Sequence, residues 1–191
     1  SRKNIDKLAN AFQSIFNKNK KNILNIELNI FIQGIEIPDV LNHTDYTNIK
    51  IHINNYSYKE NLQNILKNDI YIHLGGQEGL GLGFYEALYL GLPILTLNWT
   101  PNNEIVTHEK NGWLIECNID KIYENQECLI QRGLIDQEIL EKQIIEISKN
   151  RKKTYNIINY TIQNSIKMKL KYKKDFYTTF KYHLSSVPSF N

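Results

Sequence analysis

Apolar residues recur at helical spacing near the start of the chain and then alternate with polar ones, which predicts a helix followed by a strand. The helical face carries Leu8, Phe12 and Ile15 at intervals of three and four residues. Asn4 stands where an N-cap residue of that helix would be expected. Over residues 24–32 apolar and polar positions alternate, as in a strand with one buried face.

The middle of the chain predicts the units of a parallel sheet. Residues 70–74 are almost entirely apolar, which is typical of a strand buried on both faces. A glycine-rich loop over 75–83 follows, then a helix over about 84–90 and a strand over 94–97. Strand, loop, helix and strand in this order form one βαβ unit.

Weaker patterns complete the expected order of elements. A further strand is predicted over 49–53, a helix over 58–67, a short helix over 103–109 and a strand over 113–116. Beyond residue 119 only helices are expected, at about 119–130, 136–149 and 154–183. The predicted class is α/β, with a parallel sheet flanked by helices and extra helices at the C-terminal end.

Composition indicates one globular domain. The chain has 191 residues, of which 41% are hydrophobic and 11% aromatic, and its net charge is only +3, so it is not a disordered sequence. Cys117 and Cys128 are too few for a disulfide framework. We find no secretory signal and no apolar run of the roughly 20 residues that cross a bilayer, so the expected location is cytoplasmic.

The glycine-rich loop is the first candidate for chemistry. It leaves the carboxyl end of a buried strand and enters a helix N-terminus, where unpaired N–H groups and the helix dipole favour an anion. Two known phosphate-binding patterns do not fit: Phe84 stands where a dinucleotide fingerprint needs Gly or Ala, and Leu82 where a P-loop needs Lys. On the glycines alone, a plain tight turn is an equal alternative.

Two carboxylates make a binding site the better interpretation. Glu78 precedes the loop glycines, and Glu86 follows after seven intervening residues, within an otherwise apolar helix. An ionised carboxylate among apolar residues is costly unless it accepts hydrogen bonds, and a sugar hydroxyl is a natural donor. The alternative is a surface Glu stabilised by the helix N-terminus.

These residues carry a resemblance to a known family. Residues 78–94, EGLGLGFYEALYLGLPI, resemble the EGFGLPxxEAMAxGxPV stretch of GT-B glycosyltransferases, and the carboxylate pair is similar to their E-x7-E motif. The family that fits best is the large retaining one often called GT4, or glycosyl transferases group 1. Further segments over residues 2–12, 51–72 and 103–115 resemble other stretches of the family in the same order, so the likeness covers about residues 2–116.

The resemblance implies a role for each matching residue. Glu78 would contact hydroxyls of the transferred sugar, Glu86 would hold the ribose hydroxyls, and Lys3 would neutralise the diphosphate as it leaves. Backbone N–H groups of Gly79, Leu80 and Gly81 would meet the sugar and diphosphate, and Ile53 and Asn54 would border the base. No metal and no other cofactor is expected, because such enzymes use a positive side chain and a helix N-terminus where others use Mg²⁺.

The chain also departs from the family pattern. Gly83 replaces the family Pro, Asn54 replaces a glycine, and only Ser1 and Arg2 precede Lys3 where the family has a first strand with its Arg. The resemblance therefore implies that residues 1–191 are one nucleotide-sugar-binding domain, the C-terminal half of a GT-B fold. The upstream acceptor domain and the first strand would lie outside this chain, and the fragment would not catalyse transfer alone.

The expected function is transfer of a hexose from a nucleoside diphosphate sugar to a hydroxyl acceptor with retention. The alternative is a catalytically inactive sugar-nucleotide-binding or scaffold domain. A third interpretation uses the lysines over residues 167–181 to bind nucleic acid. We favour a docked helix with its lysines in solvent, because 20 Lys against 3 Arg follows AT-rich codons. We expect no nucleic-acid partner, and a membrane contact is compatible with the sequence without being indicated by it.

Overall fold

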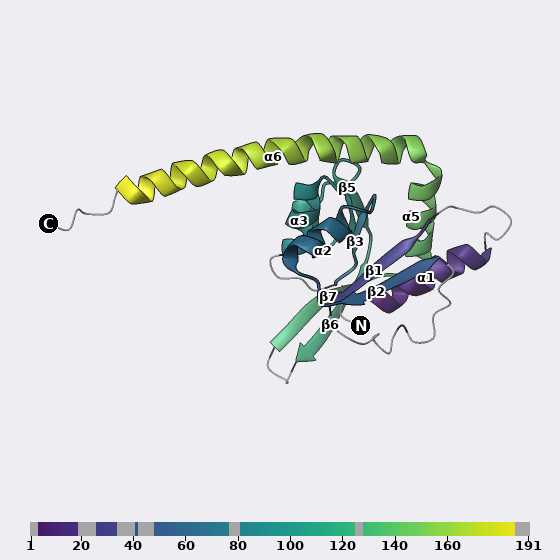
Figure 1. The fold of residues 1–191 in the computed structure, drawn as a ribbon. Coiled ribbons are helices and arrows are strands. Elements are labelled where there is room, and N and C mark those ends of the chain that lie inside the picture. The colour runs from purple at the N-terminus through teal and green to yellow at the C-terminus, as the bar shows by residue number, and fades with distance from the viewer. Residues whose placement is uncertain are drawn as a thin grey trace.

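The computed structural model describes residues 4–18, 26–33, 41, 48–76, 81–124 and 128–185. They form a mixed α/β fold (Figure 1). The elements are, in chain order, α1 (Ile5–Lys18), β1 (Leu28–Gln33), β2 (Ile49–Asn54), α2 (Tyr58–Ile65), β3 (Tyr71–His73), α3 (Leu82–Leu90), β4 (Ile94–Leu97), α4 (Asn102–Ile105), β5 (Gly112–Ile115), β6 (Asn118–Glu124), β7 (Cys128–Leu134), α5 (Gln137–Lys149) and α6 (Arg151–Ser185).

Five strands form two separate parallel sheets. β1 pairs with β2 in a register that sets Leu28 opposite Ile49. β4 lies between β3 and β5, with Tyr71 opposite Ile94 and Ile94 opposite Gly112. The parallel sheet flanked by helices is therefore confirmed, but in the described residues no strand joins β1 to β3.

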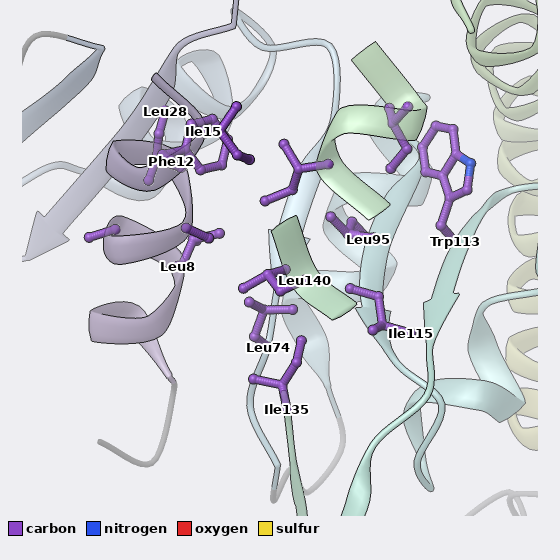
Figure 2. Close-up of a cluster of buried hydrophobic side chains, with 14 of the residues drawn as sticks. Leu8, Phe12, Ile15, Leu28, Leu74, Leu95, Trp113, Ile115, Ile135 and Leu140 are labelled. Atoms are coloured by element: carbon purple, nitrogen blue, oxygen red, sulfur yellow. The ribbon is translucent and has the colours of Figure 1, made fainter. Parts of the chain in front are cut away.

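The packing of the core explains why the middle strands are runs of apolar residues in the sequence. Leu95 and Leu97 of β4 pack into a cluster with side chains of α1 and α5, including Phe12 and Leu140 (Figure 2). Ile94, on the opposite face of β4, joins a second cluster formed mainly by α3. β4 is therefore covered on both faces, as expected of a strand in a parallel sheet.

Asn4 is used differently from the N-cap that the sequence predicts. It precedes α1, and its carbonyl accepts from Leu8 N–H at 3.0 Å. Its side chain, however, donates from Nδ2 to the carbonyl oxygen of Leu74 at 2.7 Å. This buried bond joins residues 70 positions apart, and it fixes the start of α1 next to the end of β3.

The helix expected over residues 119–130 is wrong. β6 and β7 form an antiparallel hairpin there, which projects from the body of the domain (Figure 1). The Arg132 guanidinium pairs across the strands with Asp120 at 2.9 Å. At the base of the hairpin, Gly133 N–H donates to the Gly76 carbonyl at 2.9 Å. The apolar positions of this segment follow helical spacing only approximately, so these contacts between distant residues decide for the hairpin.

The last helix is longer than expected and runs past the domain. α6 packs against α3 and α5 over its first part, and Figure 1 shows its second part extending beyond the other elements. Despite this length, none of the described helices combines the length and apolarity needed to cross a membrane.

Candidate functional site

The candidate site lies at the carboxyl edge of the two sheets. β2 ends at Asn54 and β3 at His73, and α3 begins at Leu82. The Asn4–Leu74 bond brings the start of α1 to the same edge. In an open parallel sheet this is the edge where ligands bind, because loops and helix N-termini converge there.

The N-terminus of α3 has backbone donors without a side-chain cap. Gly81 precedes the helix in the left-handed conformation, with φ 61° and ψ 42°, and makes no side-chain cap bond. Its carbonyl accepts from Phe84 N–H at 2.9 Å. The N–H groups of Leu82 and Gly83 belong to the first turn, which has no intrahelical acceptor for them. They form a positive end suited to an anion.

Both glycines at this helix start are needed for close packing. A Cβ on Gly81 would lie 2.7 Å from Cδ2 of Phe84, and the positive φ would add strain. A Cβ on Gly83 would lie 2.6 Å from the Tyr71 hydroxyl. Gly83, which replaces the family Pro, therefore lets α3 approach the side chain of Tyr71, the first residue of β3.

Glu86 lies on the half-buried flank of α3 and faces α2. Tyr58, the first residue of α2, donates a hydrogen bond to this carboxylate, and that bond together with the negative charge raises the pKa of the Tyr58 phenol. The carboxylate is therefore neither fully buried nor a plain surface group. It keeps capacity to accept from a second hydroxyl, since a carboxylate offers about four lone-pair sites.

The start of α2 is held firmly where it meets Glu86. Ser57 and Glu60 form a capping box, in which Ser57 N–H donates to the Glu60 carboxylate at 2.8 Å. These bonds hold the pKa of Glu60 below its usual range. Asn54 lies just upstream at the end of β2, exposed, with Ile53 half-buried before it. The structure thus brings Glu86 close to the segment that follows β2.

Half of the predicted site residues can be located. Ile53, Asn54, Gly81 and Glu86 lie at the carboxyl edge, on β2 and α3. Glu78, Lys3, Gly79 and Leu80 lie outside the described residues. In the described part of the chain, no group of three His, Cys, Asp or Glu side chains gathers as a metal site would require.

Sequence reasoning missed the aromatic side chains around this edge. Tyr58 was not singled out, because its contact with Glu86 joins two helices and leaves no pattern in the sequence. Phe31 stacks on His52 with ring centroids 4.6 Å apart, and Tyr56 meets Phe31 edge-on at 6.3 Å. The alternation of β1 and β2 could have indicated that Phe31 and His52 share the face opposite the core.

Comparison with known proteins adds a family and a fold. The family model described as glycosyl transferases group 1 matches residues 1–151. No curated protein matches the chain. Among solved structures, the chain is similar to one described as "Crystal structure of GtfA/B complex", with 20% identity and a TM-score of 0.53, over 92% of this chain and 34% of that chain.

A second solved structure gives the same result. It is the pneumococcal O-GlcNAc transferase GtfA in complex with UDP and GlcNAc, with 18% identity and a TM-score of 0.58, over 91% of this chain and 33% of that chain. The chain thus spans about a third of the length of these two proteins. At such identities the likeness shows a shared fold and nothing finer.

Proposed function

Because the chain belongs to the glycosyl transferases group 1 family, we propose that it is the nucleotide-sugar-binding part of a glycosyltransferase with a GT-B fold. The observation that carries this proposal is the arrangement at the carboxyl edge: the uncapped N-terminus of α3 lies beside a carboxylate, Glu86, that faces the segment after β2. The first element suits a diphosphate and the second suits ribose hydroxyls. The two solved neighbours share this α/β fold.

The proposed reaction moves a hexose from a nucleoside diphosphate sugar to a hydroxyl acceptor with retention. The bond between the anomeric carbon and the diphosphate oxygen breaks, and negative charge grows on the leaving diphosphate. The N–H groups at the start of α3, with Lys3 and the amides of Gly79 and Leu80, would stabilise that charge without a metal. Glu78 would position the transferred sugar.

Nucleotide recognition belongs to the other flank of the site. Glu86 would accept from the ribose hydroxyls while Tyr58 holds its carboxylate in place. Ile53 and Asn54 would border the base. UDP is the first nucleotide to test, because one neighbour was solved with UDP and GlcNAc. Transfer itself would need an upstream acceptor domain.

Titration calorimetry of Glu86→Ala against UDP tests the ribose assignment. We expect an affinity at least about tenfold lower than that of the unaltered chain, since a charge-assisted hydrogen bond contributes roughly 1.5–3 kcal/mol. Glu146→Ala is the matched control, because it also removes a carboxylate. Glu146 is exposed near the end of α5, and its carboxylate lies 4.0 Å from the Lys153 ammonium. We expect it to bind UDP unchanged.

The possible results separate two claims. Equal affinity of Glu86→Ala and the unaltered chain would show that Glu86 does not hold the ribose. If the unaltered chain binds neither UDP nor GDP nor their sugars, the donor-binding role of this chain is wrong. Donor binding without turnover, once an upstream domain is supplied, would favour the inactive binding or scaffold domain instead.

A further inference from the structure

α6 carries an apolar stripe that is largely exposed. Ile162, Ile166 and Leu170 recur every four residues and so share one face of the helix. Their exposed fractions are 44%, 55% and 66%. Isolated exposed aliphatic residues are common, but three in line on one helix mark an interaction surface.

The domain contacts a different face of the same helix. Ile157, Thr161 and Ser165 are buried against the domain, and they also recur every four residues. A Cβ on Gly91, at the end of α3, would come within 3.5 Å of the Ser165 hydroxyl. The same Cβ would lie 3.1 Å from Cγ1 of Ile162, so Ile162 borders the contact with α3, and Ile166 and Leu170 form the more exposed part of the stripe.

Charge is unevenly divided between α6 and the rest of the chain. Nine of the 23 Lys and Arg residues lie in α6, with only one of the 20 Asp and Glu residues. The remainder of the chain holds 14 basic and 19 acidic residues and is therefore net acidic. A codon preference for Lys explains why α6 has Lys rather than Arg, but it does not explain why acidic residues are nearly absent.

We propose that α6 binds the surface of an anionic lipid bilayer, with the stripe of Ile162, Ile166 and Leu170 entering the headgroup region and lysines such as Lys167 meeting lipid phosphates. Lys153 and Lys169 are engaged within the chain, by Glu109 and by the Tyr89 ring. An exposed apolar stripe together with an excess of lysines is the signature of helices that lie in the membrane interface. A helix of 35 residues is about 50 Å long. Figure 1 shows that it also runs past the other elements.

The apolar stripe favours lipid over nucleic acid. Phosphate contacts of nucleic-acid-binding proteins are electrostatic, and exposed aliphatic side chains add nothing to them. α6 also has eight Lys and a single Arg, whereas Arg is the residue that most often reads bases. The membrane contact does not depend on donor binding, so UDP affinity in the same preparation reports separately on the proposed function.

Vesicle flotation of the 191-residue chain tests the proposal. We expect binding to vesicles of 70% phosphatidylcholine and 30% phosphatidylglycerol, weaker binding as salt rises, and none to pure phosphatidylcholine. The double variant Ile166→Gln with Leu170→Gln should bind at least tenfold more weakly. Its matched control is Leu66→Gln at the C-cap of α2, a position that is 52% exposed, which should bind as the unaltered chain does.

A second pair of variants tests the charge. Lys167→Gln with Lys171→Gln should weaken vesicle binding. Lys59→Gln on α2 with Lys67→Gln just after α2 should not. Circular dichroism checks that each variant keeps its helix content. No binding to anionic vesicles, equal binding to neutral ones, or no effect of the Ile166 and Leu170 changes would each overturn the proposal. Tight, salt-sensitive binding of an oligonucleotide that ignores the apolar changes would assign α6 to nucleic acid.

Discussion

Gly83 of α3 packs against the side chain of Tyr71, the first residue of β3, and the contact leaves no room for a side chain at Gly83. Gly83→Ala would place its Cβ 2.6 Å from the Tyr71 hydroxyl, with the next ring atom at 3.4 Å. We expect it to lower the free energy of unfolding by about 1–3 kcal/mol, as overpacking does. Urea denaturation measures this change.

The same change should be tolerated once the hydroxyl is gone. In the Tyr71→Phe background the nearest ring atoms remain 3.4–3.8 Å from the new Cβ. There Gly83→Ala should be neutral or stabilising by up to about 1 kcal/mol, since Ala favours helix over Gly. Additive effects of the two substitutions would contradict the close contact.

Motifs identify single residues well when function depends on local spacing. Gly81 and Glu86 could be singled out because a loop and the first turns of its helix are continuous in sequence. Tyr58 could not, because its contact with Glu86 spans 28 positions and depends on how α2 packs against α3. The Asn4 side chain shows the same limit, since its partner Leu74 is set by the fold and not by the cap pattern.

At the scale of elements, strongly periodic segments were predicted and weakly periodic ones were not. The helix of α1 and the strand of β4 follow their patterns closely, because each buries a complete face. Among the β6 and β7 residues whose burial is described, only Gly133 is buried, and the apolar spacing of the segment fits both a helix and a strand. Gly133 was the better sequence signal of a strand in this segment. It approaches Gly76, and a Cβ on it would lie 3.0 Å from Sγ of Cys117.

The packing of α5 on α1 includes a buried carboxylate that makes stability depend on pH. Burial raises the pKa of Glu141, but the hydrogen bond from Lys18, at 2.8 Å, and other donors more than offset this, so the pKa lies below its usual value. A lowered folded pKa gives stability that is present above the unfolded pKa, near 4.5. That stability is lost as the pH falls through the folded value.

Glu141→Gln should therefore lower the free energy of unfolding at neutral pH and leave it unchanged in acid. We expect it to reduce the free energy of unfolding by about 1 kcal/mol at pH 7, because Lys18 is largely exposed and such pairs contribute modestly. The difference from the unaltered chain should shrink as the pH falls below about 4.5 and through the lower folded pKa. Urea midpoints at several pH values measure it, with the exposed Glu146→Gln as control. A constant difference from pH 7 to pH 3 would rule out the carboxylate as its source.

For the molecule as a whole, the division into two sheets is the main departure from a continuous parallel sheet. β1 pairs only with β2 and β3 only with β4 in the described residues, yet one hydrophobic cluster spans both sheets. The start of α1 is fixed beside the end of β3 by Asn4. A parallel strand that ended just before Asn4 would therefore lie between β1 and β3, and we propose that an upstream segment supplies it.

Amide hydrogen exchange of the 191-residue chain tests this proposal through the direction of each N–H group. Leu28 N–H donates to Asn48, just before β2. By the register Ile30 N–H also points to β2, whereas the N–H groups of Asn29 and Phe31 point away from β2 and that of Ile72 points away from β4. Leu28 and Ile30 should exchange slowly and the other three rapidly, since an unpaired strand edge gives no protection.

Adding the upstream segment should slow all three together and raise the cooperativity of unfolding, because one sheet would replace two. If Asn29, Phe31 and Ile72 are already protected in the 191-residue chain, these edges have another partner and the upstream strand is not what completes the sheet.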